Sequence, residues 1–420
     1  MLDRRLIREQ PEIIRQAIEV KGVDLNLDLL LALDQQVREL KSAVEDGQRG
    51  RREISREFAR ADEERRQQLK VSSDQLDQQL QGQRLQLQGL EEQLNDLLLR
   101  LPGIPWSEAP VGSDEAANVL IKSWGEPTHF DFQPLDHVDL VAARGWTEFA
   151  RAREVSGERA YALAGDLVLL ERAIHSYALD LLTAQGFRLI TAPSLVRESA
   201  LLGSGFFPHG REEIYSLPED NLFLAGTAEV ALCGLHSGEI LNEEQLPVLY
   251  AGISPCFRRE IGSASRDVRG LLRVHQFEKV EQFVICKPEA EESARWHVKL
   301  LSIAESILQS FQLSYQVVEC CTGDMGLGKF RMNDINTWFP SLGAYRETHS
   351  CSTLHDWQAR RANLRYRDDK DKVKFVHTLN NTAVATPRLL AALIENFQTA
   401  ERQVLIPEVL RPYLGGKSFL

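Results

Sequence analysis

A run of arginines surrounds a Gly- and Ser-rich loop in PCFRREIGSASRDVRGLLRVHQFEKVE, residues 255–281. The arginines are Arg258, Arg259, Arg266, Arg269 and Arg273. Because a guanidinium binds phosphate oxygens through paired N–H donors, and β-like arms flank the loop, the stretch predicts a hairpin with a cationic loop. Glu260 could accept from an exocyclic amine, and Phe277 offers a flat face to a base. A surface ladder of salt bridges is the alternative interpretation.

Two more clusters carry groups that suit a nucleotide. In YRETHSCS at 345–352, which alternates like a strand, Glu347 and Ser350 could supply oxygens to magnesium. In LNNTAVATPRLLAALIEN at 379–396, Thr382 is expected in a turn, and Arg388 follows Pro387 at a helix start. A guanidinium there could stack on a ring or meet a phosphate. Taken singly, each of the three clusters is a weak indication.

Residues 323–329, GDMGLGK, match the phosphate-loop pattern GxxxxGK. Phe330 follows, and it lacks the hydroxyl that a phosphate loop gives to magnesium. The next residues, MNDINTWFP, alternate like a strand where a phosphate loop needs a helix N-terminus. The sequence therefore predicts a Gly-rich turn between two strands.

The first 101 residues are expected to form a separate helical arm. Two heptad ladders of apolar residues run through 30–58 and 76–101, and no proline interrupts 12–101. They predict an antiparallel helical hairpin, a coiled coil over about 27–100, with a polar break at about 59–73. Gly47, Arg51 and Gln83 fall on the seams, so we expect loose packing in the distal half. Heptads alone equally suit a dimerisation element or a spacer.

The remainder is expected to be a mixed domain. Residues 102–130, which begin with LPGIPWSEAP, are expected to be a linker leading into a domain at 131–420. Predicted there are a helix at 166–185, a strand at 188–196 containing Pro193, further short strands, and a last long helix at about 387–398. Strands joined by turns predict an α+β fold with an antiparallel sheet.

Length and composition exclude several classes of protein. The chain has 420 residues, and its net charge of −12 argues against a nonspecific nucleic-acid binder. Residues 49–70 nevertheless hold 8 basic and 5 acidic side chains, a weak sign of phosphate contact. No apolar run is long enough for a membrane span, and we expect no secretory signal. The six cysteines show no zinc-site or disulfide spacing, so we expect no zinc and a reducing cytoplasm.

Two of the three clusters, together with one helix and strand outside them, resemble the motifs of class II aminoacyl-tRNA synthetases. FRRE…RVHQF at 257–277 is similar to motif 2, TPRLLAALIEN at 386–396 to motif 3, and the helix and strand ending at Pro193 to motif 1. More narrowly, five segments resemble the bacterial seryl-tRNA synthetase family: TAEV at 227–230, RDVRGLLRVHQFEKVE at 266–281, ETHSCS at 347–352, DWQARRANLRYR at 356–367 and HTLNNTAVATPR at 377–388. The similarity covers essentially the whole chain, the helical arm included.

The resemblance implies residue roles for ATP and Mg2+. The implied ATP-binding residues are Arg258, Arg259, Glu260, Val274, Phe277, Glu347, Thr348, His349, Ser350 and Arg388. Arg258 and Arg388 would be catalytic, with Arg258 at the α-phosphate, and adenine would lie between Phe277 and Arg388. Glu347 and Ser350 would hold Mg2+. Arg259 departs from the small residue usual in the family, so we expect its side chain to point away; Asn336 departs from a usual acid.

The resemblance also implies a serine pocket. Its residues would be Thr227, Ala228, Glu229, Arg258, Glu281 and Thr382. Thr227 and Glu229 would receive the amino group and carboxylate region, and Glu281 and Thr382 the side-chain hydroxyl. The alternative for Glu281 is a counter-charge to nearby arginines.

The implied protein is a cytoplasmic, homodimeric serine–tRNA ligase. It would form seryl-adenylate from L-serine and ATP and charge tRNA(Ser), gripping the long variable arm of that tRNA with the helical arm; tRNA(Sec) is a candidate second substrate. The alternatives are a synthetase-like paralogue that charges a carrier protein or acts as a non-catalytic regulator, and a coiled-coil scaffold.

Overall fold

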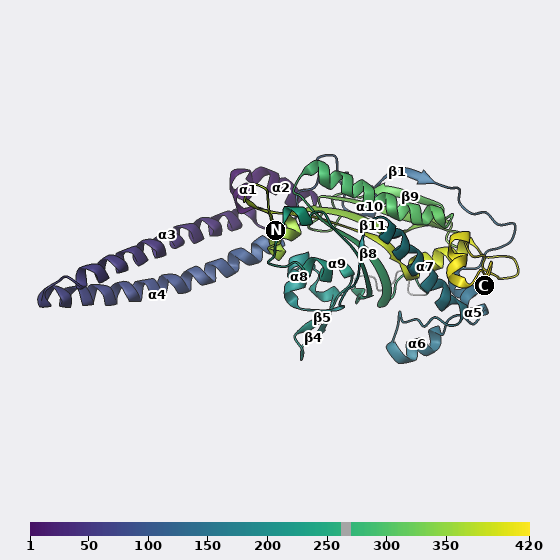
Figure 1. Cartoon of the computed structure of the whole chain (residues 1–420), viewed down its shortest axis with the longest axis horizontal. Helices are drawn as coiled ribbons and strands as arrows, with labels where there is room; N and C mark the ends of the chain where they lie inside the picture. The colour runs from purple at the N-terminus through teal and green to yellow at the C-terminus, as the bar shows by residue number, and fades with distance from the viewer. Residues whose placement is uncertain (262–269) are drawn as a thin grey trace. The chain divides into compact units, whose positions relative to one another are not determined.

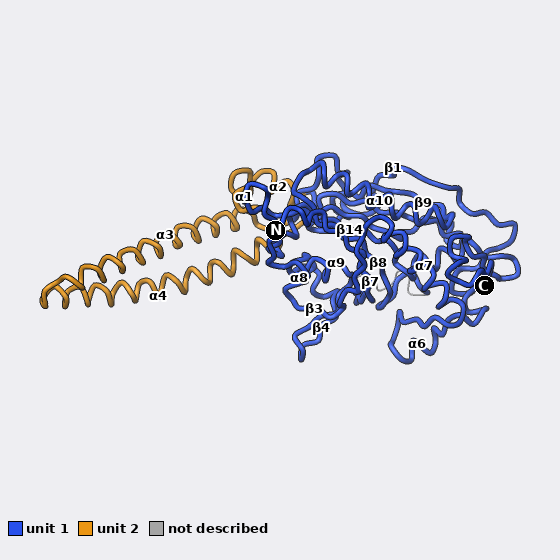
Figure 2. Tube along the Cα trace, in the orientation of Figure 1, with its two compact units in different colours: residues 1, 20–22, 102–420 blue, residues 2–19, 23–101 orange. Residues whose placement is uncertain are grey.

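The computed structural model describes residues 1–261 and 270–420, so Arg266 and Arg269 of the predicted cationic loop lie outside the described residues. The described chain forms two compact units (Figure 2). One holds residues 2–19 and 23–101, and the other holds residues 1, 20–22 and 102–420. Within the described residues, no helix is both long and apolar enough to cross a membrane.

The first unit is a long helical hairpin with two short helices before it (Figure 1). Its helices are α1 (Arg4–Glu9), α2 (Pro11–Val20), α3 (Leu27–Phe58) and α4 (Glu63–Arg100). Asn26 caps α3 by accepting from Leu29 N, and Asp62 caps α4 by accepting from Arg65 N. The turn between α3 and α4, residues 59–62, lies within the polar break predicted at about 59–73, but it is shorter, because α4 already begins at Glu63. Residues 63–73 are polar, but they contain no glycine or proline to end a helix.

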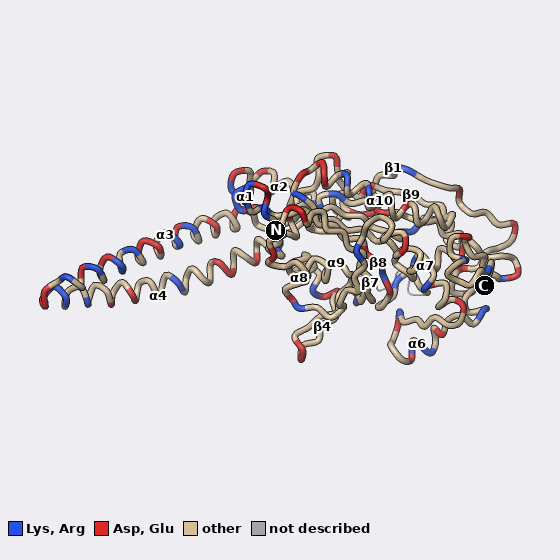
Figure 3. Tube along the Cα trace, in the orientation of Figure 1, with Lys and Arg blue, Asp and Glu red and all other residues tan. Residues whose placement is uncertain are grey.

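The predicted heptad seam holds α3 against α4. The buried seam residues are Leu30, Leu33, Val37 and Val44 of α3 and Leu69, Leu80, Leu94 and Leu98 of α4. At Gly47 a Cβ atom would lie 2.7 Å from Leu80 Cδ2, so the helices approach closely where a larger residue would clash. Beyond that point Arg51 pairs with Asp77 at 2.7 Å, both about half exposed. Charges of both signs line the hairpin and its tip (Figure 3).

The second unit is built on an eight-stranded sheet. Its strands, in spatial order, are β1 (Val119–Trp124), β9 (Tyr315–Glu319), β10 (Arg331–Phe339), β11 (Ala344–His355), β14 (His377–Ala385), β8 (Gln276–Cys286), β7 (Val248–Phe257) and β2 (Arg188–Thr191). All neighbours are antiparallel except β2 and β7, which are parallel. The predicted α+β class, with a helical hairpin and an antiparallel sheet, is confirmed.

Two three-stranded sheets and eight α-helices complete the described part of this unit. The small sheets are β3 (Leu195–Val196), β5 (Leu222–Leu224) and β4 (Tyr215–Leu217), and β13 (Val373–Phe375), β12 (Arg365–Arg367) and β6 (Ile240–Asn242). The helices are α5 (His137–Ala143), α6 (Phe149–Ser156), α7 (Asp166–Ala184), α8 (Glu198–Ser204), α9 (Ala228–Gly234), α10 (Ala290–Ser310), α11 (Trp357–Ala362) and α12 (Thr386–Asn396).

The two faces of the large sheet have different roles. Val280 and Val284 of β8 belong to the core made with α7, α10 and α12, whereas Phe283 and Ile285 belong to a second core made with α8, α9 and α11. Because side chains alternate along a strand, Lys279 and Glu281 point to that second face, next to α9. The six cysteines are all buried and free.

Several local predictions differ from the structure. The strand predicted at 188–196 is two strands, β2 and β3, separated at Pro193, which cannot donate to a sheet ladder. Residues 102–130, expected to be linker, include strand β1 at the sheet edge. Thr382, expected in a turn, lies inside β14. The turn predicted at 323–329 is confirmed, because these residues join β9 to β10.

Candidate active site

The predicted site residues gather around a cleft on the second face of the sheet. The cleft has two lobes. The residues that line the first lobe are Arg258, Glu260, Leu271, Leu272, Arg273, Val274, Phe277, Lys279, Glu347, Thr348, Thr382, Ala385, Pro387 and Arg388. The second lobe has a volume of about 380 Å³. Among the residues that line it are Thr227, Glu229, Ser350, Asn380 and the loop Gly326–Lys329. Arg258, Lys279, Glu347 and Thr382 line both lobes, so the two lobes form one continuous site.

The hairpin of β7 and β8 positions Arg258 beside Phe277. Cys256 of β7 pairs with Phe277 of β8, and Arg258 N donates to His275 O at 2.9 Å just beyond the ladder. The guanidinium carbon of Arg258 lies 5.3 Å from the centre of the Phe277 ring. Arg258 Nε donates to Gly226 O at 3.3 Å, next to the start of α9. A cation and an aromatic face therefore occupy one wall of the cleft.

Arg259 points away from the cleft. Its Nη1 donates to Glu212 O at 3.2 Å, and its backbone N donates to Glu213 O at 3.0 Å. Its side chain lines neither lobe. This is the direction that strand alternation predicts for the neighbour of an inward-facing Arg258.

Glu260 and Val274 lie just beyond the last paired residues of the hairpin, Phe257 and Gln276. Glu260 adopts a φ of 54°, a left-handed conformation that is uncommon for a residue with a Cβ. Its carboxylate pairs with Arg273 Nη1 at 3.2 Å and faces the cleft. Val274 is buried and lines the same lobe.

A β-bulge brings Glu347 and Ser350 to one side of β11. Residues three apart in a regular strand point to opposite faces. Here the register with β10 shifts: Ile335 pairs with His349, but Asn336 pairs with Glu347, so Thr348 is the extra residue. Both Glu347 and Ser350 consequently face the cleft. Ser350 Oγ is buried and forms no hydrogen bond of ordinary geometry in the described part of the chain, although it lies close enough to Asp334 to affect the pKa of that carboxyl group. A buried hydroxyl beside a carboxylate is a donor set that suits Mg2+.

Arg388 and Glu347 face each other across the cleft. Arg388 is the third residue of α12, after Thr386 and Pro387, and its Nη1 lies 3.1 Å from a Glu347 carboxylate oxygen. Arg388 also donates to the backbone oxygens of Glu347 and Leu272. Desolvation opposes ionisation of Glu347, but the charge and hydrogen bond of Arg388 outweigh it and lower the pKa of Glu347. The Glu347 carboxylate is therefore ionised at neutral pH.

Thr348 and His349 separate into different environments. Thr348 lines the first lobe and hydrogen-bonds to Thr337 at 2.7 Å. His349 points into the core instead, where its Nε2 lies 3.1 Å from Ala383 O. Burial lowers the pKa of His349 to about 4, so this imidazole is neutral. Its side chain does not line either lobe.

The start of α9 supplies the predicted Thr227 and Glu229. Thr227 is the N-cap, and its hydroxyl accepts from Glu229 N at 3.3 Å. Both side chains line the second lobe, whereas Ala228 is buried and lines neither. Gln358 Nε2 donates to the Glu229 carboxylate at 2.6 Å. Desolvation, reinforced by the charge of Glu281, raises the pKa of Glu229.

Glu281 lies behind the lining of the cleft. It is 1% exposed and does not line either lobe. Thr227 Oγ1 donates to its carboxylate at 3.1 Å, and Lys279 forms a short ion pair with it. Thr382, its cross-strand partner on β14, lines both lobes.

Sequence reasoning missed Lys279 and Lys329, which line the second lobe, and Asp334, which pairs with the lining residue Ser350. Lys279 lies in the motif 2 stretch, and its position two residues from Phe277 was the available signal. Lys329 ends the 323–329 turn, which was tested only as a phosphate loop. Asp334 gave no signal, because nothing in the sequence aligns β10 with Ser350.

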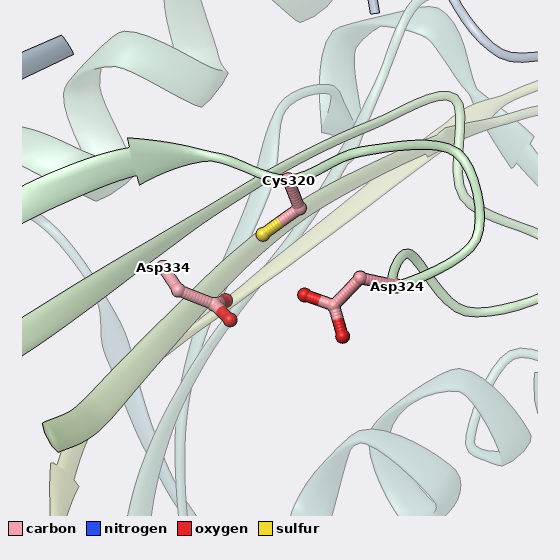
Figure 4. A group of neighbouring side chains, drawn as sticks. All are labelled: Cys320, Asp324 and Asp334. Atoms are coloured by element: carbon pink, nitrogen blue, oxygen red, sulfur yellow. The ribbon is translucent and has the colours of Figure 1, made fainter. Parts of the chain in front are cut away.

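Asp334 forms a cluster with Cys320 and Asp324, of which Cys320 and Asp334 are buried and Asp324 is half-buried (Figure 4). One candidate ligand atom from each residue lies within 4.8 Å of the others, which would allow a metal ion. Asn118 Nδ2 already donates to one Asp324 oxygen at 2.8 Å. Desolvation, with a smaller contribution from the charge of Glu347, raises the pKa of Asp334 to about 7. Burial raises the pKa of the Cys320 thiol, which is therefore protonated at neutral pH.

Comparisons with known proteins agree along the whole chain. The family described as "Seryl-tRNA synthetase N-terminal domain" matches residues 1–105, and "tRNA synthetase class II core domain (G, H, P, S and T)" matches residues 214–397. The serine–tRNA ligase of Deinococcus radiodurans is 49% identical over 420 residues, which are 100% of this chain and 99% of that protein. The serine–tRNA ligase of Symbiobacterium thermophilum is 42% identical over 98% of each chain.

Solved structures show the same relationship. The seryl-tRNA synthetase of Pyrococcus horikoshii, crystallised with ATP, is 37% identical, with a TM-score of 0.92 over 100% of this chain and 99% of that one. The cytoplasmic serine–tRNA ligase of Naegleria fowleri, in complex with AMP, is 30% identical, with a TM-score of 0.88 over 100% and 98% of the two chains. The fold is thus shared over the full length of the chain, and the chain belongs to the seryl-tRNA synthetase family, the serine–tRNA ligases.

Proposed function

We propose that the two lobes of the cleft bind ATP and L-serine side by side and carry out serine activation. The observation that carries this assignment is the convergence of Arg258, Glu347, Thr382 and Arg388, from three separate segments of the chain, on one cleft. A serine carboxylate oxygen attacks the α-phosphorus, the bond to the β-phosphate oxygen breaks, and pyrophosphate leaves. No side chain acts as a nucleophile, so catalysis consists of positioning and charge stabilisation.

The first lobe is assigned to ATP. Arg258 is placed to neutralise charge that develops on the α-phosphate, and Phe277 and Arg388 to hold the adenine ring between them. Glu260 would accept from the adenine amine. Since Glu260 now pairs with Arg273 and Arg388 with Glu347, ATP binding exchanges these ion pairs for contacts to the nucleotide.

Mg2+ is assigned to Glu347 and Ser350, with the ionised carboxylate and the buried hydroxyl as oxygen donors. The ion would neutralise phosphate charge during the reaction. Thr348 supports this pair from the bulge. His349 would contribute to the ATP site only by holding β11 in place, since its neutral ring faces the core. No zinc is proposed.

The second lobe is assigned to L-serine. The Glu229 carboxylate and the Thr227 hydroxyl would receive the serine ammonium, with the Ala228 backbone between them. Thr382 reaches the lobe directly, and Glu281 is proposed to accept the serine hydroxyl once Thr227 releases it. Arg259 is assigned to the ATP site only because it follows Arg258 in the sequence, since its side chain turns to Glu212.

The seryl group then passes to tRNA(Ser), whose 3′-terminal hydroxyl attacks the adenylate. We assign recognition of the long variable arm to α3 and α4, because double-stranded RNA is recognised by shape, phosphates and 2′-hydroxyls rather than by its deep major groove. A homodimer, a cytoplasmic setting and a second substrate, tRNA(Sec), are part of the same proposal.

The decisive experiment is amino-acid-dependent exchange of labelled pyrophosphate into ATP. We expect exchange with L-serine and little with alanine, threonine or glycine. Exchange with none of them, or loading of serine on a carrier protein but not on tRNA(Ser), would contradict the proposal.

A further inference from the structure

The turn between β9 and β10 forms one wall of the second lobe. Gly326, Leu327, Gly328 and Lys329 all line it, opposite Thr227 and Glu229 at the start of α9. The wall is closely packed: a Cβ atom on Gly328 would lie 2.3 Å from Trp357 Cε3. The segment that resembles a phosphate loop in sequence is therefore part of the cleft, although it has a different structure.

Lys329 brings an ammonium group into this lobe without a counter-ion. Its Nζ contacts Met332 Sδ at 3.3 Å, a weak acceptor, and it forms no ion pair within residues 1–261 and 270–420. Its positive charge partly offsets the rise in the pKa of Glu229, which burial causes, and adds a little to the fall in the pKa of Glu347, which Arg388 causes. A lysine in this state has its three donors available for an anionic ligand.

The other cations of the lobe already have partners or roles. Lys279 forms its ion pair with the buried Glu281. Arg258 lies over Phe277 on the side of the lobe shared with the ATP site. Bound serine carries an ammonium and a carboxylate, so a lobe with Glu229 for the first needs a cation for the second.

A second lysine, Lys21, holds the wall in place. It follows α2 in the chain, yet it belongs to the compact unit that contains the sheet. Its Nζ donates to Lys329 O at 2.6 Å, to Leu327 O at 3.0 Å and to Gly326 O at 3.3 Å. Lys21 is only 9% exposed. Three carbonyl oxygens converging on one buried ammonium fix the backbone from which the Lys329 side chain extends.

We propose that Lys329 binds the carboxylate of L-serine and that Lys21 is a positioning residue for it. The inference rests on the proposed assignment of this lobe to serine. One carboxylate oxygen forms the new bond to phosphorus as pyrophosphate leaves, and the other remains as the acyl oxygen of the adenylate. The carboxylate charge is lost in that step, so Lys329 stabilises bound serine more than the adenylate. Its loss therefore raises the KM for serine more than it lowers kcat.

Lys329→Met keeps the length of the side chain and removes its charge. In pyrophosphate exchange we expect the KM for serine to rise about 10- to 100-fold, as for loss of one charge-assisted hydrogen bond, with the KM for ATP changed less than about twofold. L-serinamide keeps the ammonium and hydroxyl but has a neutral amide in place of the carboxylate. We expect its inhibition constant to be the same in wild type and Lys329→Met.

Lys122→Met is the matched control, since it removes a lysine that pairs with Glu305 and does not line the cleft. It should leave all three constants unchanged. Lys21→Met should raise the KM for serine, and Lys21→Arg should restore it, because a guanidinium also donates to carbonyl oxygens.

An unchanged serine KM in Lys329→Met overturns the inference. An equal rise in the KM for ATP would also overturn it, because Lys329 would then contact a phosphate. So would an equal rise in the inhibition constant of L-serinamide, which would indicate that the lobe had collapsed. Failure of the underlying assignment is distinguishable, because the wild-type protein would then show no serine-dependent exchange.

Discussion

The hydroxyl of Thr227 donates a hydrogen bond to the carboxylate of Glu281 at 3.1 Å, so two residues assigned to serine already satisfy each other. One comes from the start of α9 and the other from the middle of β8. A ligand hydroxyl that enters between them replaces one hydrogen bond with another. A ligand without a hydroxyl gains nothing there, and this difference is a means of rejecting alanine.

Glu281→Gln tests this account. If Glu281 accepts the serine hydroxyl, kcat/KM for serine should fall much more than kcat/KM for alanine, because a site built around a hydroxyl can reject the analogue without it by about 10⁴-fold. The measurement is exchange with each amino acid. An equal loss with both would leave Glu281 as a counter-charge, here to Lys279.

Arg258→Ala and Arg259→Ala form a matched pair on neighbouring residues. Loss of Arg258 should lower serine activation by about 100-fold or more, as for loss of a preorganised charge donor. Loss of Arg259, whose side chain contacts Glu212 O, should change it less than about threefold. Comparable losses in steady-state exchange would mean that Arg259 reaches the nucleotide.

The distal half of the helical hairpin can be removed at Gly47, where its helices approach closely. Replacing residues 48–79 by a short Gly-Ser turn joins Gly47 to Leu80, which are already in contact. Serine activation should persist, since the cleft lies in the other unit, and kcat/KM for tRNA(Ser) should fall by about 100-fold or more through lost RNA contacts. Normal charging of tRNA(Ser) by this variant would make the hairpin a spacer.

The raised pKa of Glu171 predicts that the stability of the protein depends on pH. Desolvation, with the charge of Glu278 adding to it, raises the pKa of Glu171 to about 7. The folded protein therefore binds more protons than the unfolded chain between about pH 4.5 and 7, and stability falls as pH rises through that window, by on the order of 2 kcal/mol.

Glu171→Gln should remove most of this fall. Its melting temperature should exceed that of wild type at pH 8 and match it near pH 4.5. Parallel curves for the two proteins across the window would show that Glu171 titrates normally in the folded state.

Much of the fold follows from patterns that local physics controls. The heptads predicted the α3–α4 hairpin, and the Gly323–Lys329 turn followed from the strands around it. The hairpin turn lies within the predicted break, which extended too far because charged residues at 63–73 suppress the apolar pattern without weakening the helix. Strand β1 was missed because it lies at a sheet edge, where all its residues remain exposed.

The site needed information that no local pattern contains. Glu347 and Ser350 share a face only because Thr348 is bulged against β10. Asp334 became a neighbour of Ser350 through the register of the same two strands. Lys21 reaches a loop about three hundred residues later in the chain, and a contact of that separation leaves no trace in spacing.

The six buried, free cysteines have a practical consequence. Burial raises the pKa values of Cys233, Cys256, Cys286, Cys320 and Cys351, so these thiols are poor nucleophiles toward alkylating reagents. A cysteine introduced at an exposed position of the hairpin, such as Arg60→Cys, would then be the preferred point of attachment for a fluorophore. Movements of the hairpin could be followed in an otherwise native chain, without replacing the natural thiols.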